Sequence, residues 1–257
     1  MSDQDDIDAS RAPLLDHLIE LRRRLLISFA TLAVLFGVCL YFAEPIFGFL
    51  VRPLLKAGQA KVYYTQLFEA FFVQLKVAFF AASTLSFPVV ANQLWQFVAP
   101  GLYRKEKRAL LPFLLATPVL FAAGCSMAYF IAIPAALHFL LGYQTNVGGV
   151  QQEALPSVGN YLTFVMQFLF GFGVSFLFPV LLMLIERAGL VTLRQLVKAQ
   201  RYAILGCFAI ALVLAPPDAG SMIILATPLV GLYYLTLAAI WLTHRRRARA
   251  EASGTVA

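Results

Sequence analysis

Long apolar stretches alternate with short polar segments along most of the chain. Six mainly apolar runs cover roughly residues 25–43, 67–91, 110–138, 158–185, 202–214 and 221–243. Most have the ~20 residues that a helix needs to cross the ~30 Å hydrocarbon core of a bilayer. The pattern therefore predicts an all-α, polytopic membrane protein with six transmembrane helices. An even number of spans returns the chain to the side on which it starts.

The segment before the first run has a different pattern. Residues 1–12 are polar and acidic, so we expect them to be disordered. In residues 13–24, leucines recur at spacings of three and four, which places them on one helical face. Glu20 and Arg24 share another face, one helical turn apart. We predict an amphipathic helix that lies on the membrane surface and continues into the first span.

Positive charge predicts the orientation of the spans. Sixteen of the twenty lysines and arginines fall at the N-terminus, in the loops around 92–108 and 187–201, or in the tail. The first intervening loop holds three, and Lys76 lies inside the second run. Cations on short loops keep those loops cytoplasmic. We therefore expect both termini to be cytoplasmic, with one bundle domain over 1–243 and a disordered basic tail over 244–257.

The remaining loops and spans depart from an ideal bundle. The loops at 44–66 and 139–157 are long and partly apolar, so we expect short helices that cap the outer face. The fifth run has thirteen residues, about 20 Å of helix, and would thin the bilayer locally. Prolines within or beside the runs predict kinked spans and a concave bundle: Pro88, Pro100, Pro118, Pro134, Pro179 and Pro228.

Composition excludes several classes of protein. Hydrophobic residues make up 61% of the chain and charged residues 13%, whereas a soluble domain is nearer half and a quarter. The net charge of +7 lies mainly on loops of one side, which gives no case for nucleic acid. The three cysteines fall in apolar runs and suggest small hydrophobic residues rather than disulfides. The acidic N-terminus does not have the order of a cleaved signal peptide.

Candidate chemistry is sparse. The chain has no HExxH, GxSxG, CxxC or glycine-rich phosphate motif. His17, His138 and His244 are too scattered to suggest a metal site. We expect no catalysis, no cofactor and no metal.

Three ionisable residues stand out. Lys76 lies about ten residues into its span, where a charge is costly and often functional. Alternatively, it reaches the surface or pairs with Glu69 two turns away. Glu20 and Glu106 have cations nearby, so a local ion pair is the simplest interpretation of each. Together, two carboxylates on one membrane surface could bind adjacent arginines bidentately.

These segments resemble the TatC family, the multispanning receptor subunit of the twin-arginine protein translocase. The resemblance covers about residues 13–243. The matching stretches are HLIELRRRL at 17–25, EAFF at 69–72 with Lys76, SFP at 86–88, QLWQFVAPGLY at 93–103 with Glu106, YLTFV at 161–165, FGVSF at 172–176 and PPD at 216–218.

The resemblance implies a receptor for signal peptides with two consecutive arginines, in the inner membrane of a bacterium or a related membrane. Folded cargo would cross the membrane at the expense of the proton-motive force. The implied partners are single-span TatA and TatB proteins in an oligomeric complex within the bilayer. The expected signal-peptide-binding residues are Glu20, Arg22, Arg23, Gln93, Phe97 and Glu106. The expected structural or partner contacts are Pro53, Glu69, Lys76, Gln167 and Asp218.

The chain departs from the family pattern at three positions. Leu177 follows FGVSF where the family often has a glutamate or glutamine, and Ala215 and Met222 replace polar residues around PPD. Gln167 is one of few polar groups left in the fourth span and could substitute, although it lies nearly three turns from Leu177.

A secondary transporter or channel for a small solute is the alternative function. Such a protein needs polar groups that converge at mid-membrane. Apart from Lys76, this chain offers mainly neutral polar side chains there, which argues against it.

Overall fold

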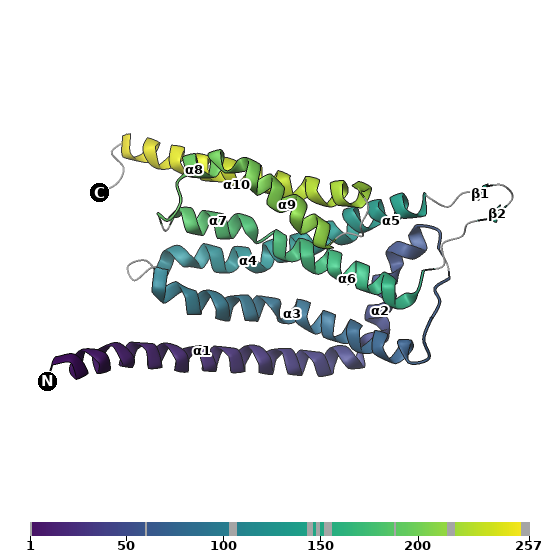
Figure 1. The fold of residues 1–257 in the computed structure, drawn as a ribbon, viewed down its shortest axis with the longest axis horizontal. Helices are drawn as coiled ribbons and strands as arrows, with labels where there is room; N and C mark the ends of the chain where they lie inside the picture. Colours follow the sequence, from purple (N-terminus) through teal and green to yellow (C-terminus); the bar gives the residue numbers. More distant parts are fainter. Residues whose placement is uncertain are drawn as a thin grey trace. The chain divides into compact units, whose positions relative to one another are not determined.

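The computed structural model of the chain describes residues 2–59, 61–102, 107–142, 146–147, 150–151, 156–187, 189–214 and 219–252. Their regular structure is helical apart from a short hairpin (Figure 1). The helices are α1 (Ser2–Tyr41), α2 (Ala43–Lys56), α3 (Glu69–Leu102), α4 (Lys107–Met127), the π-helix η1 (Ala128–Ala132), α5 (Ile133–Leu141), α6 (Val158–Ser175), α7 (Phe178–Arg187), α8 (Leu193–Lys198), α9 (Gln200–Leu214) and α10 (Ala219–Ala252).

The predicted all-α, polytopic class is confirmed. Within the described residues, five helical segments are long and apolar enough to cross a membrane: His17–Tyr41, Glu69–Phe97, Leu115–Leu141, Val158–Glu186 and Met222–Arg245. The fifth predicted run lies in α9, whose apolar stretch Gln200–Leu212 is shorter than these. A span through α9 and the cytoplasmic location of both termini stay predictions.

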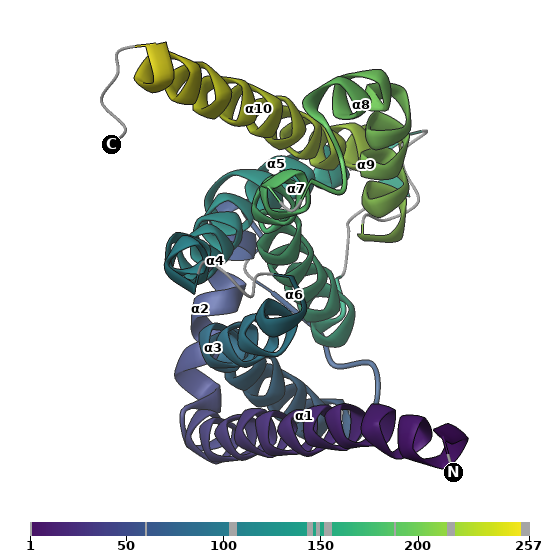
Figure 2. The ribbon, with the colours of Figure 1, turned by 90° about the vertical axis from the view of Figure 1, so that its left-hand side faces the viewer.

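Contacts divide the chain into two compact units, and the single bundle domain over 1–243 stays a prediction. The first unit comprises Met1–Phe47 and Gln74–Pro118, and the second comprises Gly48–Val73 and Val119–Ala257. In the first unit, α1 runs beside α3 (Figures 1 and 2). Their contact is built on small buried residues, because Cys39 of α1 packs against Ala78 and Ala82 of α3.

The second unit centres on α10. Helix α9 runs beside α10, and α7 and α8 also pack against it (Figure 2). Tyr233 of α10 is buried and donates its hydroxyl to the backbone carbonyl of Leu196 in α8 at 2.6 Å. Near the end of α10, His244 Nε2 lies 2.5 Å from Glu186 Oε1 of α7. These two polar contacts fasten α7 and α8 to α10.

Two irregularities within spans lie next to prolines, as the sequence predicted. The π-helix η1 ends two residues before Pro134, and α6 gives way to α7 just before Pro179. Proline has no N–H and its ring crowds the carbonyl four residues earlier, which favours a widened or broken turn before it. Pro179 then occupies the first turn of α7, where a missing N–H costs nothing.

Both ends of the described chain are more helical than expected. Helix α1 begins at Ser2 and α10 continues to Ala252, where we predicted disorder over 1–12 and 244–257.

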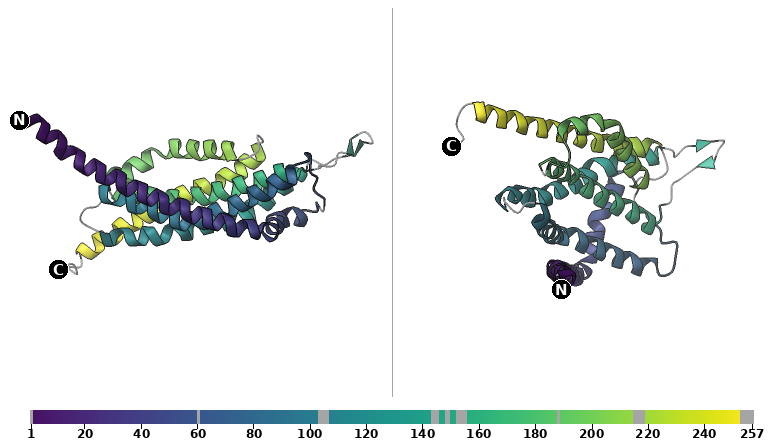
Figure 3. Two further views of the ribbon diagram at one scale, coloured as in Figure 1. Left: turned by 90° about the horizontal axis from the view of Figure 1, so that it is seen from below. Right: turned by 60° about the vertical axis from the view of Figure 1, so that its left-hand side comes forward.

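The loop at 139–157 also differs from the expectation of a short helix. It carries an antiparallel hairpin of β1 (Asn146–Val147) and β2 (Val150–Gln151), with Val147 opposite Val150 (Figure 3). Valine favours strands, and the intervening sequence Gly-Gly is typical of two-residue hairpin connections. The earlier loop does contain the predicted short helix, α2.

Two glycines allow α4 and α6 to cross closely within the second unit. A Cβ on Gly124 would lie 2.6 Å from the carbonyl oxygen of Phe172 and 3.0 Å from Cα of Gly173. A Cβ on Gly173 would lie 2.6 Å from the Phe121 ring. At the same crossing, Cys125 donates its thiol to the carbonyl of Leu169 at 3.4 Å. Small residues at a helix crossing permit this backbone approach, as in other membrane bundles.

We expect Gly173→Ala to lower the free energy of unfolding by about 1–3 kcal/mol, because the added methyl must push the two helices apart. Gly231→Ala is the matched control, since a Cβ there meets nothing within 4 Å. It should be neutral or stabilising by up to ~1 kcal/mol through helix propensity. Reversible denaturant unfolding in bicelles measures both values, and equal effects would contradict the close crossing.

Candidate functional site

Three of the predicted signal-peptide-binding residues meet where the N-terminal half of α1 packs against the C-terminal part of α3. This group lies wholly within the first unit. We call it the α1–α3 cluster, and it consists of His17, Glu20, Arg24, Gln93, Gln96 and Phe97. The predicted residues in it are Glu20, Gln93 and Phe97.

Arg24 holds the polar part of the cluster together. Its Nη2 donates to Glu20 Oε1, one helical turn earlier on α1. Its Nη1 donates to the backbone carbonyl of Gln93 at 3.3 Å and to Gln96 Oε1 at 3.2 Å, both on α3. One guanidinium therefore pairs with the carboxylate of its own helix and with two oxygens of the neighbouring helix. The local ion pair expected for Glu20 is confirmed.

Aromatic rings complete the contact. The rings of His17 and Phe97 stack with centroids 4.3 Å apart and planes 18° apart. On the same stretch of α3, Trp95 donates its indole N–H to the hydroxyl of buried Thr117 in α4 at 2.9 Å. The aromatic residues of the QLWQF segment thus fix α3 against both neighbours, which holds Gln93 and Gln96 in place beside Arg24.

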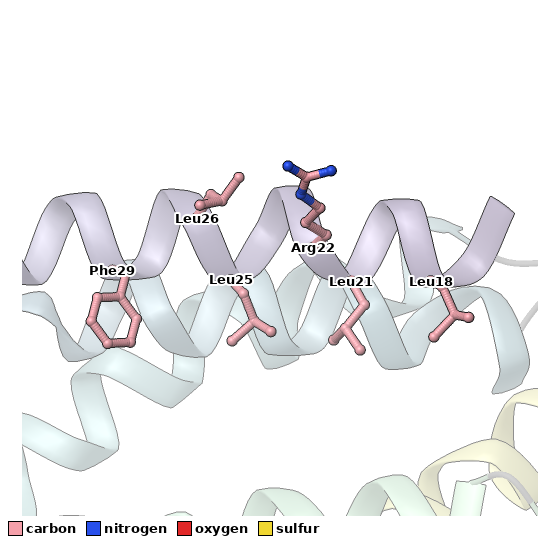
Figure 4. Close-up of a pocket in the computed structure, with 6 residues that line it drawn as sticks. All are labelled: Leu18, Leu21, Arg22, Leu25, Leu26 and Phe29. Carbon is pink, nitrogen blue, oxygen red and sulfur yellow. The ribbon is translucent and has the colours of Figure 1, made fainter. Parts of the chain in front are cut away.

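Arg22 lies on a different face of α1. Two positions correspond to about 200° around a helix, so Arg22 points away from Glu20. It lines a groove of about 350 Å³ whose other walls are Leu18, Leu21, Leu25, Leu26 and Phe29. Figure 4 shows four of these side chains in a row along one side of α1, with Arg22 and Leu26 on another side. The structure therefore does not bring Arg22 into the α1–α3 cluster, and Arg23 is exposed.

Glu69 joins the start of α3 to the start of α6 in the second unit. Its Oε2 accepts from the Thr65 N–H at 2.5 Å, from the Thr65 hydroxyl at 2.9 Å and from the Gln66 N–H at 3.2 Å. Its Oε1 accepts from the Gly159 N–H at 2.8 Å and the Ser157 hydroxyl at 3.3 Å. One carboxylate thus satisfies backbone donors at two helix starts, where unpaired N–H groups and the helix dipole favour an anion.

The glycine next to this carboxylate is required by the close approach. A Cβ at position 159 would lie 2.8 Å from Glu69 Oε1. Beside it, Tyr63 and Ser157 form a short parallel bridge, in which the Val158 N–H donates to the Tyr63 carbonyl at 3.0 Å. The loop before α3 is therefore fixed to the start of α6 by backbone as well as by side-chain bonds.

Pro53 has an identifiable structural consequence. It lies inside α2 and cannot donate to the carbonyl of Phe49, four residues earlier. The hydroxyl of Tyr129 donates to that carbonyl at 2.8 Å, and the Tyr129 ring stacks on Phe49 at 4.4 Å. Tyr161 donates to the next carbonyl, that of Leu50, at 2.9 Å. Two tyrosines therefore bind α2 at the turn that proline weakens.

Two other predicted residues, Lys76 and Gln167, are exposed. Lys76 is exposed on α3 and makes no ion pair with any described residue. Gln167 is exposed on α6, about 15 Å along the axis from Leu177. Its substitution for a polar group at Leu177 stays a prediction. Glu106 and Asp218 lie outside the described residues.

Several contributing residues escaped the sequence argument. The sequence indicates one contact of Arg24, because its spacing from Glu20 predicts an ion pair. Nothing in the sequence indicates its hydrogen bonds to α3. Tyr129 and Gly159 act only through tertiary contacts, which no local pattern encodes. Among the described residues, no group of three histidine, cysteine or acidic side chains could hold a metal ion.

The α1–α3 cluster can bind a guanidinium. A carboxylate, a backbone carbonyl and an amide oxygen converge on the planar fork of Arg24, which matches such acceptors better than an ammonium does. The side chain of Glu20 is 37% exposed, whereas that of Arg24 is 16% exposed. The carboxylate is therefore open to a ligand approaching from outside.

Comparison with known proteins places this arrangement in context. Residues 16–228 match the family described as Sec-independent protein translocase protein (TatC). A protein of that name from Magnetococcus marinus is 44% identical over 245 residues, 95% of this chain and 89% of the relative. The Escherichia coli K12 protein of that name is 37% identical over 224 residues, 86% of this chain and 85% of the relative.

Solved structures agree. A crystal structure described as the twin arginine translocase receptor TatC has a TM-score of 0.77 and 36% identity, and the match covers 88% of this chain and 98% of that one. A second crystal structure of that receptor, in the detergent DDM, has a TM-score of 0.78 and 34% identity, covering 87% and 98%.

The two tyrosine contacts on α2 lead to a matched pair of substitutions. Tyr129→Phe keeps the ring but leaves the Phe49 carbonyl without the donor that replaces Pro53, so it should cost about 1 kcal/mol of unfolding free energy. Tyr161→Phe should cost less, because the Leu50 carbonyl keeps its intrahelical partner. Denaturant unfolding in bicelles ranks the two variants, and the reverse order would contradict the role assigned to Pro53.

Glu69→Gln should loosen both helix starts, because one acceptor oxygen becomes a donor and cannot serve all the N–H groups. Hydrogen–deuterium exchange should accelerate at the amides of Thr65, Gln66 and Gly159. The amide of Gln195, capped by Thr192 in α8, is the internal control and should keep its rate. Unchanged protection at all three amides would show that Glu69 does not join the two segments.

Proposed function

Because the chain belongs to the TatC family of Sec-independent protein translocase proteins, we propose that it is the receptor that binds twin-arginine signal peptides. It is a multispanning membrane subunit of that translocase. The solved structures similar to it are described as twin arginine translocase receptors. Binding takes place at the cytoplasmic surface, before folded cargo crosses the membrane.

The single observation that carries the proposal is the guanidinium held in the α1–α3 cluster. Glu20 pairs with Arg24 while Gln93 and Gln96 supply further oxygens, so the acceptors that an arginine side chain requires are assembled there. Charge-assisted bonds to a carboxylate are about twice as strong as neutral ones, and the fork geometry favours arginine over lysine. A ligand with two adjacent arginines needs a second acceptor of this kind nearby.

Glu106 is our candidate for the second acceptor. Helix α3 ends at Leu102 and α4 begins at Lys107, so Glu106 falls in the sequence between them. Phe97, which stacks on His17 in the α1–α3 cluster, precedes it by nine residues on the same polypeptide. This proximity along the chain supports a shared binding surface for Glu20 and Glu106, with apolar residues of the signal peptide against the aromatic side chains.

Orientation follows from charge. With α9 as a sixth, short span, the loops alternate so that sixteen cations lie inside and three lie outside. Both termini are then cytoplasmic, and the surface that holds Glu20 faces the compartment where signal peptides are made. The surrounding cations repel a basic ligand in general, so only close carboxylates can retain it.

The same subunit nucleates a larger complex. Membership of the translocase family implies association with other components of the translocase, which we take to be single-span TatA and TatB proteins. Transport of folded cargo then draws on the proton-motive force. Pro53, Glu69, Lys76, Gln167 and Asp218 are the positions that we assign to structural support or partner contact.

A small-solute transporter has less support. In the described spans, the hydroxyls of serine and threonine mostly donate back to a carbonyl of their own helix, as Thr163 does to Gly159 and Thr236 to Leu232. Lys76 and Gln167 are both exposed. Such side chains do not form the polar mid-membrane site that a transporter needs.

Photo-crosslinking of a twin-arginine signal peptide to the chain in native membranes tests the receptor. Glu20→Gln and Glu106→Gln should each abolish the crosslink, because each removes a charge that holds a guanidinium. Glu44→Gln is the control, since Glu44 is exposed in the first turn of α2, within the first predicted outer loop. Unchanged crosslinking in both glutamate variants, with folded protein, would overturn the proposal.

A further inference from the structure

Arg24 occupies the carboxylate that the proposed function assigns to the ligand. Its Nη2 donates to Glu20 Oε1, while its Nη1 donates to the Gln93 carbonyl and to Gln96 Oε1. Gln96 is itself oriented by its neighbour, because its Nε2 donates to Asn92 Oδ1 at 3.0 Å. The chain thus carries its own arginine at the point where a foreign arginine is expected to bind.

The fit of Arg24 is incomplete. Its Nε is buried and has no hydrogen-bond partner among the described residues. A buried donor without a partner is unfavourable, which lowers the net stabilisation that Arg24 gains at this site. Glu20 is the more exposed member of the pair, so a ligand can reach the carboxylate while Arg24 stays against α3.

We propose that Arg24 is an affinity-setting residue, which neutralises Glu20 in the empty receptor and must release it when a twin-arginine ligand binds. This inference rests on the proposed function and names how that same site is regulated. After release, Arg24 keeps its bonds to the Gln93 carbonyl and Gln96 Oε1, so the displaced guanidinium is not left unpaired.

Displacement lowers the affinity for every ligand by the same factor. When the binding-competent state is only fractionally populated, the apparent dissociation constant rises by the inverse of that fraction. The factor multiplies the affinities for arginine and lysine ligands alike, so Arg24 does not change their ratio. Arg24 raises the ligand concentration that is needed for binding, so weak ligands stay unbound at concentrations where a complete twin-arginine segment binds.

The test measures peptide binding to the full chain in lipid nanodiscs. Two fluorescent peptides are compared, with Arg-Arg or Lys-Lys before the same apolar stretch. Arg24→Lys retains the charge but loses the fork that reaches both helices, so both peptides should bind about threefold to tenfold more tightly, with an unchanged ratio. Arg24→Gln should bind both at least as tightly as Arg24→Lys. Arg194→Gln, at an exposed cation on α8 in the second unit, controls for loss of charge and should change the binding of neither peptide.

Gln96→Leu should change the peptide affinity in the opposite direction from the Arg24 variants, and it changes no charge. Arg24 uses the Gln96 side-chain oxygen in both states, but once Glu20 is released its charge depends on the α3 oxygens alone, so the bond to Gln96 is stronger in the bound state. The Arg-Arg peptide should therefore bind about twofold to threefold more weakly. In the double variant with Arg24→Lys this loss should disappear, because Gln96 acts through the guanidinium. Gln96 is exposed, so this variant should fold even if the Arg24 variants do not.

The outcomes separate the two ideas. If the unmodified chain binds both peptides equally or not at all, the receptor proposal fails. If it prefers the Arg-Arg peptide but Arg24→Lys binds that peptide equally or less tightly, Arg24 is not a competitor and the inference is overturned. A weaker Gln96→Leu variant whose loss persists in the double variant would equally overturn it, because Gln96 would then contact the ligand directly.

Discussion

Polar groups that leave water must be satisfied by the protein itself, and this constraint governs the described structure. In a bilayer an unpaired N–H, carbonyl or charge costs several kcal/mol, because no water replaces the missing partner. Pro53 removes a donor from α2, and Tyr129 supplies another. Arg24 brings a charge to the end of a span, and Glu20 neutralises it. These polar contacts therefore exist because particular residues create polar or charged groups that require a partner within the protein.

The same constraint explains why binding capacity is concentrated in few places. Hydroxyls such as those of Ser28 and Thr227 return their hydrogen bonds to their own helices, at 2.9 and 2.8 Å, and offer little to a ligand. Charged side chains cannot be satisfied so locally. In the α1–α3 cluster, the Glu20 carboxylate is both paired and partly exposed, which is the combination that the proposed exchange with a ligand requires.

Hydropathy predicted the spans because apolar length is a property of the local sequence, and prolines marked the η1 and α6–α7 irregularities. The hairpin at 146–151 and the helical ends of α1 and α10 were not predicted, since both depend on short-range preferences that overall polarity obscures. In the candidate site, Glu20, Gln93 and Phe97 were named from the resemblance, and the structure brings them together. Arg22 was separable from Glu20 by helical phase, since two positions turn it about 200° around the helix, but the resemblance named both residues without using that phase.

The two faces of α1 give this helix two separate tasks. Toward α3 it presents His17, Glu20 and Arg24, which need fixed partners within the protein. On the other side, Leu18, Leu25 and Phe29 are exposed. Such an apolar surface is stable only against lipid chains or another apolar helix. The ligand recognition that we propose and packing of the apolar side against a neighbour would therefore use different residues of α1.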